Sequence, residues 1–209
     1  MSTPQRLFVL GATGHIGGHL LTRALARGHA VTAFVRSPRK LAARAGLTVV
    51  AGDPCDRDAL AAALPGHDAI VSSLGPRLGD AFRAGCTLMG DSAASVVAAA
   101  AQARTRRLLV VSSALLFPEE GLMFRFFRRL LGQHLRDLRT MEAVLTGSDL
   151  AWTVARPPRL VAGADASFRA VAGGLPERHR ATTFDAVAAF LLDAVERDRF
   201  HRAVVGVSR

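Results

Sequence analysis

The sequence predicts an α/β fold in which a doubly wound, mostly parallel sheet is covered by helices on both faces. Short apolar runs alternate along the chain with longer helical stretches. The apolar residues are mostly Ala, Val and Leu, and aromatic residues make up only 6% of the chain. Buried parallel strands have continuous apolar sequences, and their crossover connections are right-handed. The alternation therefore favours helices on both faces of one sheet.

The first half of the chain gives the clearest alternation. Gly28 ends the first expected helix, and Pro65-Gly66 ends the second. The expected strands cover residues 7–10, 30–35, 47–51, 69–72 and 107–111, and the expected helices cover 14–27, 56–64 and 90–103.

The second half is less regular. We expect helices at 134–145 and 183–196 and strands at 152–155 and 203–207, with Pro157-Pro158 stopping the first of these strands. No repeat, low-complexity tract or linker interrupts the sequence. The expectation is one domain spanning residues 1–209, with a small C-terminal elaboration on the substrate side.

The formal net charge of +10 comes almost entirely from arginine, since Lys40 is the only lysine. The arginines are scattered from Arg6 to Arg209, which is typical of solvated arginines on helix faces. An anionic small-molecule ligand is the next explanation. Nucleic acid is not expected as a partner, because no aromatic–basic interleaving or reader motif is present.

The two cysteines, Cys55 and Cys86, have neither metal-ligand spacing nor the pattern of a disulfide framework. The N-terminus lacks the apolar stretch of a signal peptide, and no apolar run approaches the roughly 20 residues of a membrane span. We expect a cytoplasmic protein with no metal and no membrane partner, as a monomer or homodimer.

A glycine-rich turn, Gly11-Ala-Thr-Gly14-His-Ile-Gly17, follows the first strand and opens the first helix. The first glycine permits a tight turn, the second a close approach to a pyrophosphate, and the third close helix–sheet packing. The N–H groups of His15 and Ile16 would point at the anion, and Thr13 can add a hydroxyl donor. This context predicts a Rossmann-type dinucleotide site; an ordinary glycine-rich turn is the alternative.

The end of the second strand indicates which dinucleotide binds. NAD sites usually place an acidic residue there for the ribose 2′-hydroxyl, but this strand continues into Arg36-Ser37-Pro38-Arg39-Lys40. A guanidinium can pair with a 2′-phosphate, which a carboxylate would repel. We predict NADP(H), with Arg36 as the main partner and Arg39 or Ser37 assisting; a solvated basic loop is the alternative.

Over nearly its whole length the chain resembles the atypical short-chain dehydrogenase/reductases, in particular the NAD(P)H-binding, NmrA-like set that includes flavin reductase. The resemblance rests on the glycine turn and several later blocks. These are Val31 to Arg36, Gly52-Asp53, Ser72 to Gly75, Val110 to Ser113, Met141-Glu142, Leu150 to Leu160 and Thr183 to Leu192.

The resemblance implies positions for further cofactor-binding residues. Asp53 and Pro54 would lie beside the adenine, and Ser73, Leu74 and Gly75 would line the ribose and pyrophosphate path. Ser112 and Ser113 would sit beside the nicotinamide, and Arg156, Pro157 and Pro158 would shape the far wall. Asp53 as a helix N-cap, and the two serines as a plain strand end, remain alternatives.

The chemistry is limited by the absence of tyrosine, since ordinary short-chain dehydrogenases move a proton with a Tyr and Lys pair. A flavin, quinone or tetrapyrrole-like acceptor delocalises incoming charge and needs little proton help. Two hypotheses stand: an NADPH-dependent reductase of such an acceptor, and a non-catalytic NADP(H) sensor. Ser112 or Ser113 could orient the reactants, and His134 could donate a proton, although a lone His at a helix start is more often structural or solvated.

A segment rich in Phe and Arg stands between the fifth strand and the following helix. It carries Phe124, Phe126, Phe127, Leu130 and Leu131 among Arg125, Arg128 and Arg129. It could be a lid over an aromatic, acidic acceptor, a partner-binding helix or an interfacial membrane helix. The plainest expectation is a helix with its Phe and Leu side chains packed inward.

Overall fold

The computed structural model describes residues 3–75, 87–118, 122–177 and 181–209. Cys86 and Gly121 lie outside these residues, and the side chain of Phe124 is likewise not described.

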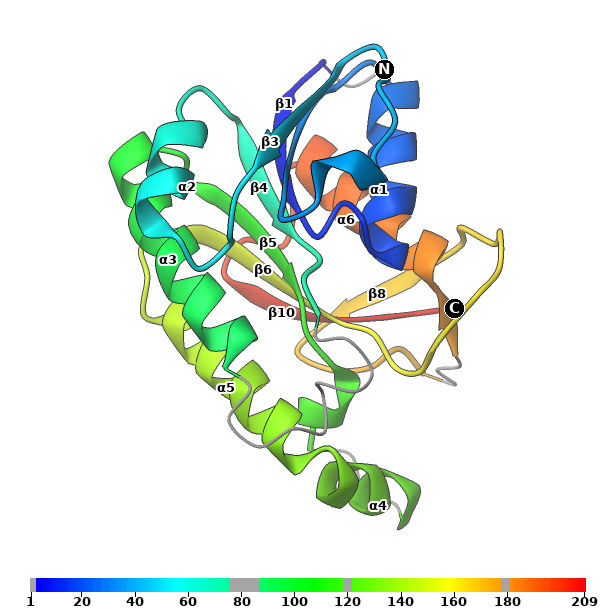
Figure 1. Ribbon diagram of the computed structural model, residues 1–209. Helices are drawn as coiled ribbons and strands as arrows, with labels where there is room; N and C mark the ends of the chain where they lie inside the picture. Colours follow the sequence, from blue (N-terminus) through cyan, green and yellow to red (C-terminus); the bar gives the residue numbers. More distant parts are fainter. Residues whose placement is uncertain (1–2, 76–86, 119–121, 178–180) are drawn as a thin grey trace.

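The centre of the molecule is an eight-stranded sheet in the order β3-β2-β1-β4-β5-β6-β10-β8 (Figure 1). Every neighbouring pair is parallel except β10 and β8, which are antiparallel. Its strands are β1 (Arg6–Leu10), β2 (Ala30–Val35), β3 (Leu47–Ala51), β4 (Ala69–Ser72), β5 (Arg107–Val111), β6 (Ala151–Arg156), β8 (Arg169–Ala172) and β10 (Ala203–Ser208). The order 3-2-1-4-5-6 is that of a doubly wound Rossmann sheet, so the predicted fold class is confirmed.

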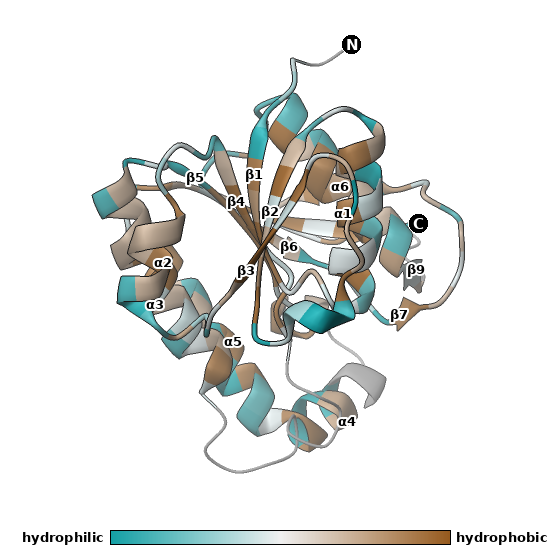
Figure 2. Cartoon of the chain, turned by 45° about the horizontal axis from the view of Figure 1, so that its top comes forward, coloured by the Kyte–Doolittle hydropathy of each residue, from teal (hydrophilic) through white to brown (hydrophobic). Residues whose placement is uncertain are grey.

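Helices cover both faces of this sheet (Figure 1). One face packs against α1 (His15–Ala26) and α6 (Phe184–Glu196), and the other against α2 (Arg57–Ala63), α3 (Leu88–Ala103) and α5 (Gly132–Thr146). Side chains of adjacent strand residues point to opposite faces, so Leu7 and Val9 of β1 join one buried cluster and Phe8 and Leu10 join the other. Figure 2 shows the hydrophobic residues gathered along the strands between the two helical layers.

Local signals explain where several helices begin and end. The Asp56 side chain accepts hydrogen bonds from the Asp58 and Ala59 N–H groups at the start of α2. Thr183 caps α6 in the same way, with a 2.9 Å bond from the Ala186 N–H. Gly28 follows α1 with a φ of +82°, a left-handed conformation that suits glycine.

The expected strands and helices are present, with most ends shifted by at most two residues. Three short strands were not expected: β8, and the pair β7 (Leu160–Val161) and β9 (Thr182–Thr183), which forms a separate parallel sheet. β8 lies at the sheet edge with mostly exposed residues, and β7 and β9 are only two residues long each. None of them offers the apolar run that identified the other strands.

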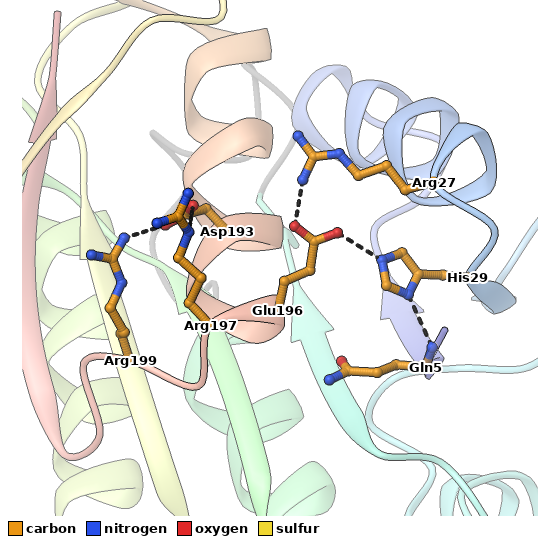
Figure 3. A network of polar contacts seen from close by, with 7 residues as sticks. All are labelled: Gln5, Arg27, His29, Asp193, Glu196, Arg197 and Arg199. Atoms are coloured by element: carbon orange, nitrogen blue, oxygen red, sulfur yellow. Dashed lines mark hydrogen bonds and ion pairs between the residues drawn. The ribbon is translucent and has the colours of Figure 1, made fainter. Parts of the chain in front are cut away.

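A polar network closes the end of the sheet opposite the glycine turn (Figure 3). Glu196 of α6 accepts hydrogen bonds from Arg27 at 2.5 Å and from Nε2 of the buried His29 at 2.9 Å. The Gln5 N–H donates to Nδ1 of His29 at 3.0 Å, so the imidazole proton lies on Nε2. The network joins the end of α1 and the approach to β1 to the last turn of α6.

Candidate functional site

The glycine turn is shaped by contacts that exclude any side chain. Gly11 has a φ of +79°, and a Cβ there would lie 2.7 Å from the Ser73 carbonyl oxygen. A Cβ on Gly17 would lie 2.1 Å from the Gly11 carbonyl oxygen. Glycine at these two positions therefore lets β1 turn beside the end of β4 and lets α1 start directly against that turn.

The N-terminus of α1 is left open for an anion. Gly14 is the N-cap, with no side chain to bond the first N–H groups, and the first turn contains no acidic residue. Those N–H groups and the helix dipole favour negative charge at this end. The exposed Thr13 stands just before the cap, and Ile16 is buried in the core.

The His15 side chain points elsewhere. Its ring stacks on Phe184 of α6, with a centroid distance of 4.6 Å. The backbone N–H of His15, and not its ring, therefore remains the group predicted to contact an anion. The stacking also ties the start of α1 to the start of α6.

A cleft of about 250 Å³ lies at the carboxyl ends of β1, β2 and β4. It is lined by Gly11, Thr13, Gly14, Phe34, Val35, Arg36, Ser37, Lys40, Pro54, Ser73, Leu74 and Gly75. Nine of these were predicted to bind a cofactor, while Phe34, Val35 and Lys40 were not. Asp53, Arg39, Ser112, Arg156, Pro157 and Pro158 are not among the lining residues.

Two cations from one loop reach this cleft. Arg36 follows β2, and Lys40 ends the short 3₁₀ turn η1 (Pro38–Lys40). Neither side chain has a hydrogen-bond or ion-pair partner within the described part of the chain, and both are exposed. None of the described lining residues carries a carboxylate. The described lining residues therefore give the cleft a positive charge, with no acidic side chain among them to balance it.

Beside the cleft, the buried Phe34 of β2 packs against Gly52, which follows β3. A Cβ on Gly52 would lie 2.0 Å from the Phe34 ring, so a side chain at 52 would displace this core ring. Asp53 accepts a 2.9 Å hydrogen bond from the Cys55 N–H, which shapes the turn around Pro54. The N-cap of the following helix α2 is Asp56, so Asp53 does not have the helix N-cap role given above as its alternative.

Ser73 fastens the end of β4 to the glycine turn. Its N–H and its hydroxyl both donate to the Leu10 carbonyl oxygen, at 3.0 and 3.2 Å. Leu74 and Gly75 follow at the cleft wall. The predicted ribose and pyrophosphate path therefore lies beside the predicted phosphate-binding turn.

The residues predicted for the nicotinamide end form a network of their own. The buried Ser112 hydroxyl donates to Oε1 of Glu142 at 2.6 Å. Arg156 donates to both carboxylate oxygens of Glu142, at 3.0 and 2.5 Å, and its guanidinium lies over the Phe117 ring, 4.7 Å from the centroid. The Ser112 hydroxyl hydrogen and the Arg156 guanidinium are thus engaged within the protein.

Ser113 differs from Ser112. Its oxygen accepts a 3.3 Å bond from the Leu115 N–H and so caps the 3₁₀ turn η3 (Ala114–Leu116). Its hydroxyl hydrogen has no acceptor among the described residues. The Ala114 N–H donates to the Pro157 carbonyl oxygen at 2.9 Å, so the segments after β5 and β6 are joined.

His134 lies in the first turn of α5, away from the cleft residues. Burial lowers its pKa below the ordinary value, opposed by the nearby Asp137 carboxylate. Its Nδ1 is buried without a hydrogen-bond partner among the described residues. The side chain is therefore held as a neutral imidazole at neutral pH.

The strand order and the glycine turn define the class: a Rossmann-type dinucleotide-binding protein. The chain belongs to the NAD(P)H-binding family, whose sequence profile matches residues 11–198. The resemblance to the atypical short-chain dehydrogenase/reductases is thereby confirmed.

Individual relatives match smaller parts or share the fold. The 3 beta-hydroxysteroid dehydrogenase/Delta 5-->4-isomerase of Mycobacterium tuberculosis is 45% identical over 65 residues, 31% of this chain and 18% of that protein. The matched segments span less than a third of such curated relatives.

Two solved structures cover nearly the whole chain. A Veillonella parvula short-chain dehydrogenase/reductase in complex with NADP has a TM-score of 0.83 and 21% identity, covering 99% of this chain and 95% of that one. ChuY, an anaerobilin reductase from Escherichia coli O157:H7, has a TM-score of 0.79 and 24% identity, covering 97% and 96%. Both likenesses show the shared fold.

Sequence reasoning missed Phe34, Val35 and Lys40 at the cleft and Glu142 as the partner of Ser112 and Arg156. Lys40 stood in the quoted basic run but was passed over in favour of Arg39. Glu142 was noted only as part of a matching block. A search for an acidic partner for Arg156, at the end of a predicted strand, could have identified Glu142.

Proposed function

We propose that this protein is an NADPH-dependent reductase that transfers hydride to a conjugated acceptor such as a flavin, a quinone or a linear tetrapyrrole. The observation that carries the proposal is the positive cleft beside the glycine turn, with Arg36 and Lys40 both unpaired among the described residues. The NADP complex of the Veillonella parvula protein and the reductase title of ChuY support it.

The residues present fit the adenosine-phosphate half of the cofactor. The open start of α1 would receive the pyrophosphate, and Arg36 with Lys40 would receive the 2′-phosphate, since both are cations at the end of β2. The bound nicotinamide, when reduced, supplies the hydride.

At the other end the protein offers little acid–base help. The chain has no tyrosine, Ser112 donates to Glu142, and the partial burial of His134 lowers the pKa of its imidazole. The Ser113 hydroxyl remains available to orient a ligand. Such a site suits an acceptor whose conjugated system spreads the incoming charge, with the proton coming from water.

The test is consumption of NADPH with FMN, FAD, a quinone and biliverdin offered one at a time. We expect oxidation with at least one acceptor. The matched control is Arg36→Glu, which keeps the fold but places a carboxylate against the 2′-phosphate, and it should lose NADPH turnover. No turnover by wild-type protein that demonstrably binds NADPH would overturn the reductase assignment.

A second function, an NADP(H) sensor without catalysis, is favoured by one specific observation. The Ser112 hydroxyl, predicted to lie beside the nicotinamide, is committed to the Glu142–Arg156 pair. The sensor hypothesis predicts tight NADPH binding, no turnover with any acceptor, and a changed protease-cleavage pattern on binding. A cleavage pattern unaffected by NADPH would count against it.

A further inference from the structure

The helix α4 (Leu122–Leu130) exposes three of its apolar side chains to solvent. Phe126 is 62% exposed, Leu130 51% and Phe127 40%, and together they make up most of the large exposed hydrophobic residues described. The Phe126 and Phe127 rings contact each other edge to face, with centroids 5.5 Å apart. The expectation of inward packing is therefore wrong for these three side chains, whereas Leu131 is half-buried against the core.

One arginine of the same helix faces the protein. Arg128 donates from Nε to the Leu115 carbonyl oxygen at 3.0 Å and from its other nitrogen to the Phe117 carbonyl oxygen. Phe126 and Leu130 lie two residues before and after Arg128, about 200° around the helix. The helix is thus anchored by Arg128, while the described apolar side chains Phe126 and Leu130 point to solvent instead of packing on the core.

Arginines border the exposed apolar face. Arg125 and Arg129 are exposed, four residues apart on one helical row next to the row of Phe126 and Leu130. Neither has a hydrogen-bond or ion-pair partner within the ranges that the structure describes. Figures 1 and 2 show α4 at the lower end of the molecule, beyond α5 and away from the sheet.

We propose that α4 is a docking helix for the surface of an anionic lipid bilayer. Phe126, Phe127 and Leu130 would enter the boundary between headgroups and acyl chains, and Arg125 and Arg129 would pair with lipid phosphates. A short helix with exposed aromatic and aliphatic residues bordered by arginines has the character of an interfacial helix.

Charge decides between this occupant and a second copy of the chain. In a two-fold dimer through α4, Arg125 and Arg129 would face the same arginines of the other copy, between chains that each carry a net charge of +10. An anionic bilayer supplies both an apolar phase and the opposite charge. Within the described part of the chain, no helix is long and apolar enough to cross a membrane. The expectation of no membrane partner rested on the lack of such a span alone.

The test is sedimentation of the full-length protein with vesicles of phosphatidylcholine, alone or mixed with phosphatidylglycerol. We expect binding to the anionic vesicles, weakened by salt, and little binding to the neutral ones. Phe126→Glu with Leu130→Glu should abolish binding. Arg125→Glu with Arg129→Glu should reduce it about 25-fold or more, at roughly a factor of five for each arginine near an anionic surface.

Two controls match these variants. Val171→Glu changes another exposed apolar residue, on the edge strand β8, and should bind as wild type does. Arg57→Glu with Arg106→Glu makes the same change in net charge at exposed positions outside α4 and should retain most of the binding. Failure of wild-type protein to bind anionic vesicles would overturn the proposal. A second result would also overturn it: Phe126→Glu with Leu130→Glu abolishes a concentration-dependent dimer, or the capture of an acidic protein, but leaves vesicle binding intact.

Discussion

The Ser112 hydroxyl donates a 2.6 Å hydrogen bond to the Glu142 carboxylate, across 30 residues of sequence and between the end of β5 and α5. Arg156, from the end of β6, completes the group. Through these bonds Ser112 helps to hold Glu142 and Arg156 in place near the predicted nicotinamide end of the site.

Ser112→Ala tests that role. The variant removes one hydrogen bond to a charged group, so we expect a loss of about 1.5–3 kcal/mol in the free energy of unfolding. The affinity for NADPH should change less than about threefold, a difference below 1 kcal/mol. Urea unfolding and calorimetry measure the two quantities. A large loss of NADPH affinity at unchanged stability would show that Ser112 contacts the cofactor instead.

Gly17→Ala tests the packing of the glycine turn. The added Cβ would lie 2.1 Å from the Gly11 carbonyl oxygen, so α1 must move away from the turn. We expect a destabilisation of about 1–3 kcal/mol, typical of overpacking, in urea unfolding.

Gly18→Ala is the matched control in the same helix. Its Cβ would meet only the Ala12 carbonyl oxygen, at 4.0 Å. Alanine favours a helix by up to about 1 kcal/mol over glycine, so this variant should be as stable as wild type or more stable. Equal effects of the two substitutions would contradict the role given to Gly17.

Asp185 gives a pH-dependent prediction. Hydrogen bonds from Arg23 at 2.5 and 2.7 Å lower the pKa of this buried carboxyl group, and His19 Nδ1 lies 3.3 Å from it. Because the folded-state pKa lies below the unfolded value of about 3.9, the ion pair stabilises the fold above that pH. The contribution is lost as the pH falls through the folded pKa.

Asp185→Asn should therefore be less stable than wild type by about 1.5–3 kcal/mol at neutral pH, with the difference shrinking below about pH 4. Thermal unfolding at a series of pH values measures this. Asp149→Asn, at an exposed carboxylate, should follow the wild-type profile. A difference between Asp185→Asn and wild type that persists undiminished in acid would show that the ion pair does not carry it.

The sequence patterns predicted most of the sheet because buried parallel strands need continuous apolar runs, as in Leu7 to Leu10. They also located the glycine turn, since no other residue fits beside Ser73. They did not show that Ser112 bonds Glu142, because that contact depends on how α5 packs over β5. Lys40 lines the cleft and Arg39 does not because of the η1 turn. The exposure of Phe126 and Leu130 on α4 depends on the hydrogen bonds of Arg128 to the protein. Each of these is a tertiary relationship that local pattern does not contain.

The central claim is that Arg36 and Lys40 read a 2′-phosphate beside the glycine turn. Calorimetric titration of NADPH and NADH into wild-type protein, Arg36→Ala with Lys40→Ala, and Arg39→Ala tests it most directly. We predict that wild type and Arg39→Ala prefer NADPH by about 10- to 100-fold, from charge-assisted hydrogen bonds, and that the double variant loses this preference. Equal affinity of wild-type protein for NADPH and NADH, or an unchanged preference in the double variant, would contradict the account.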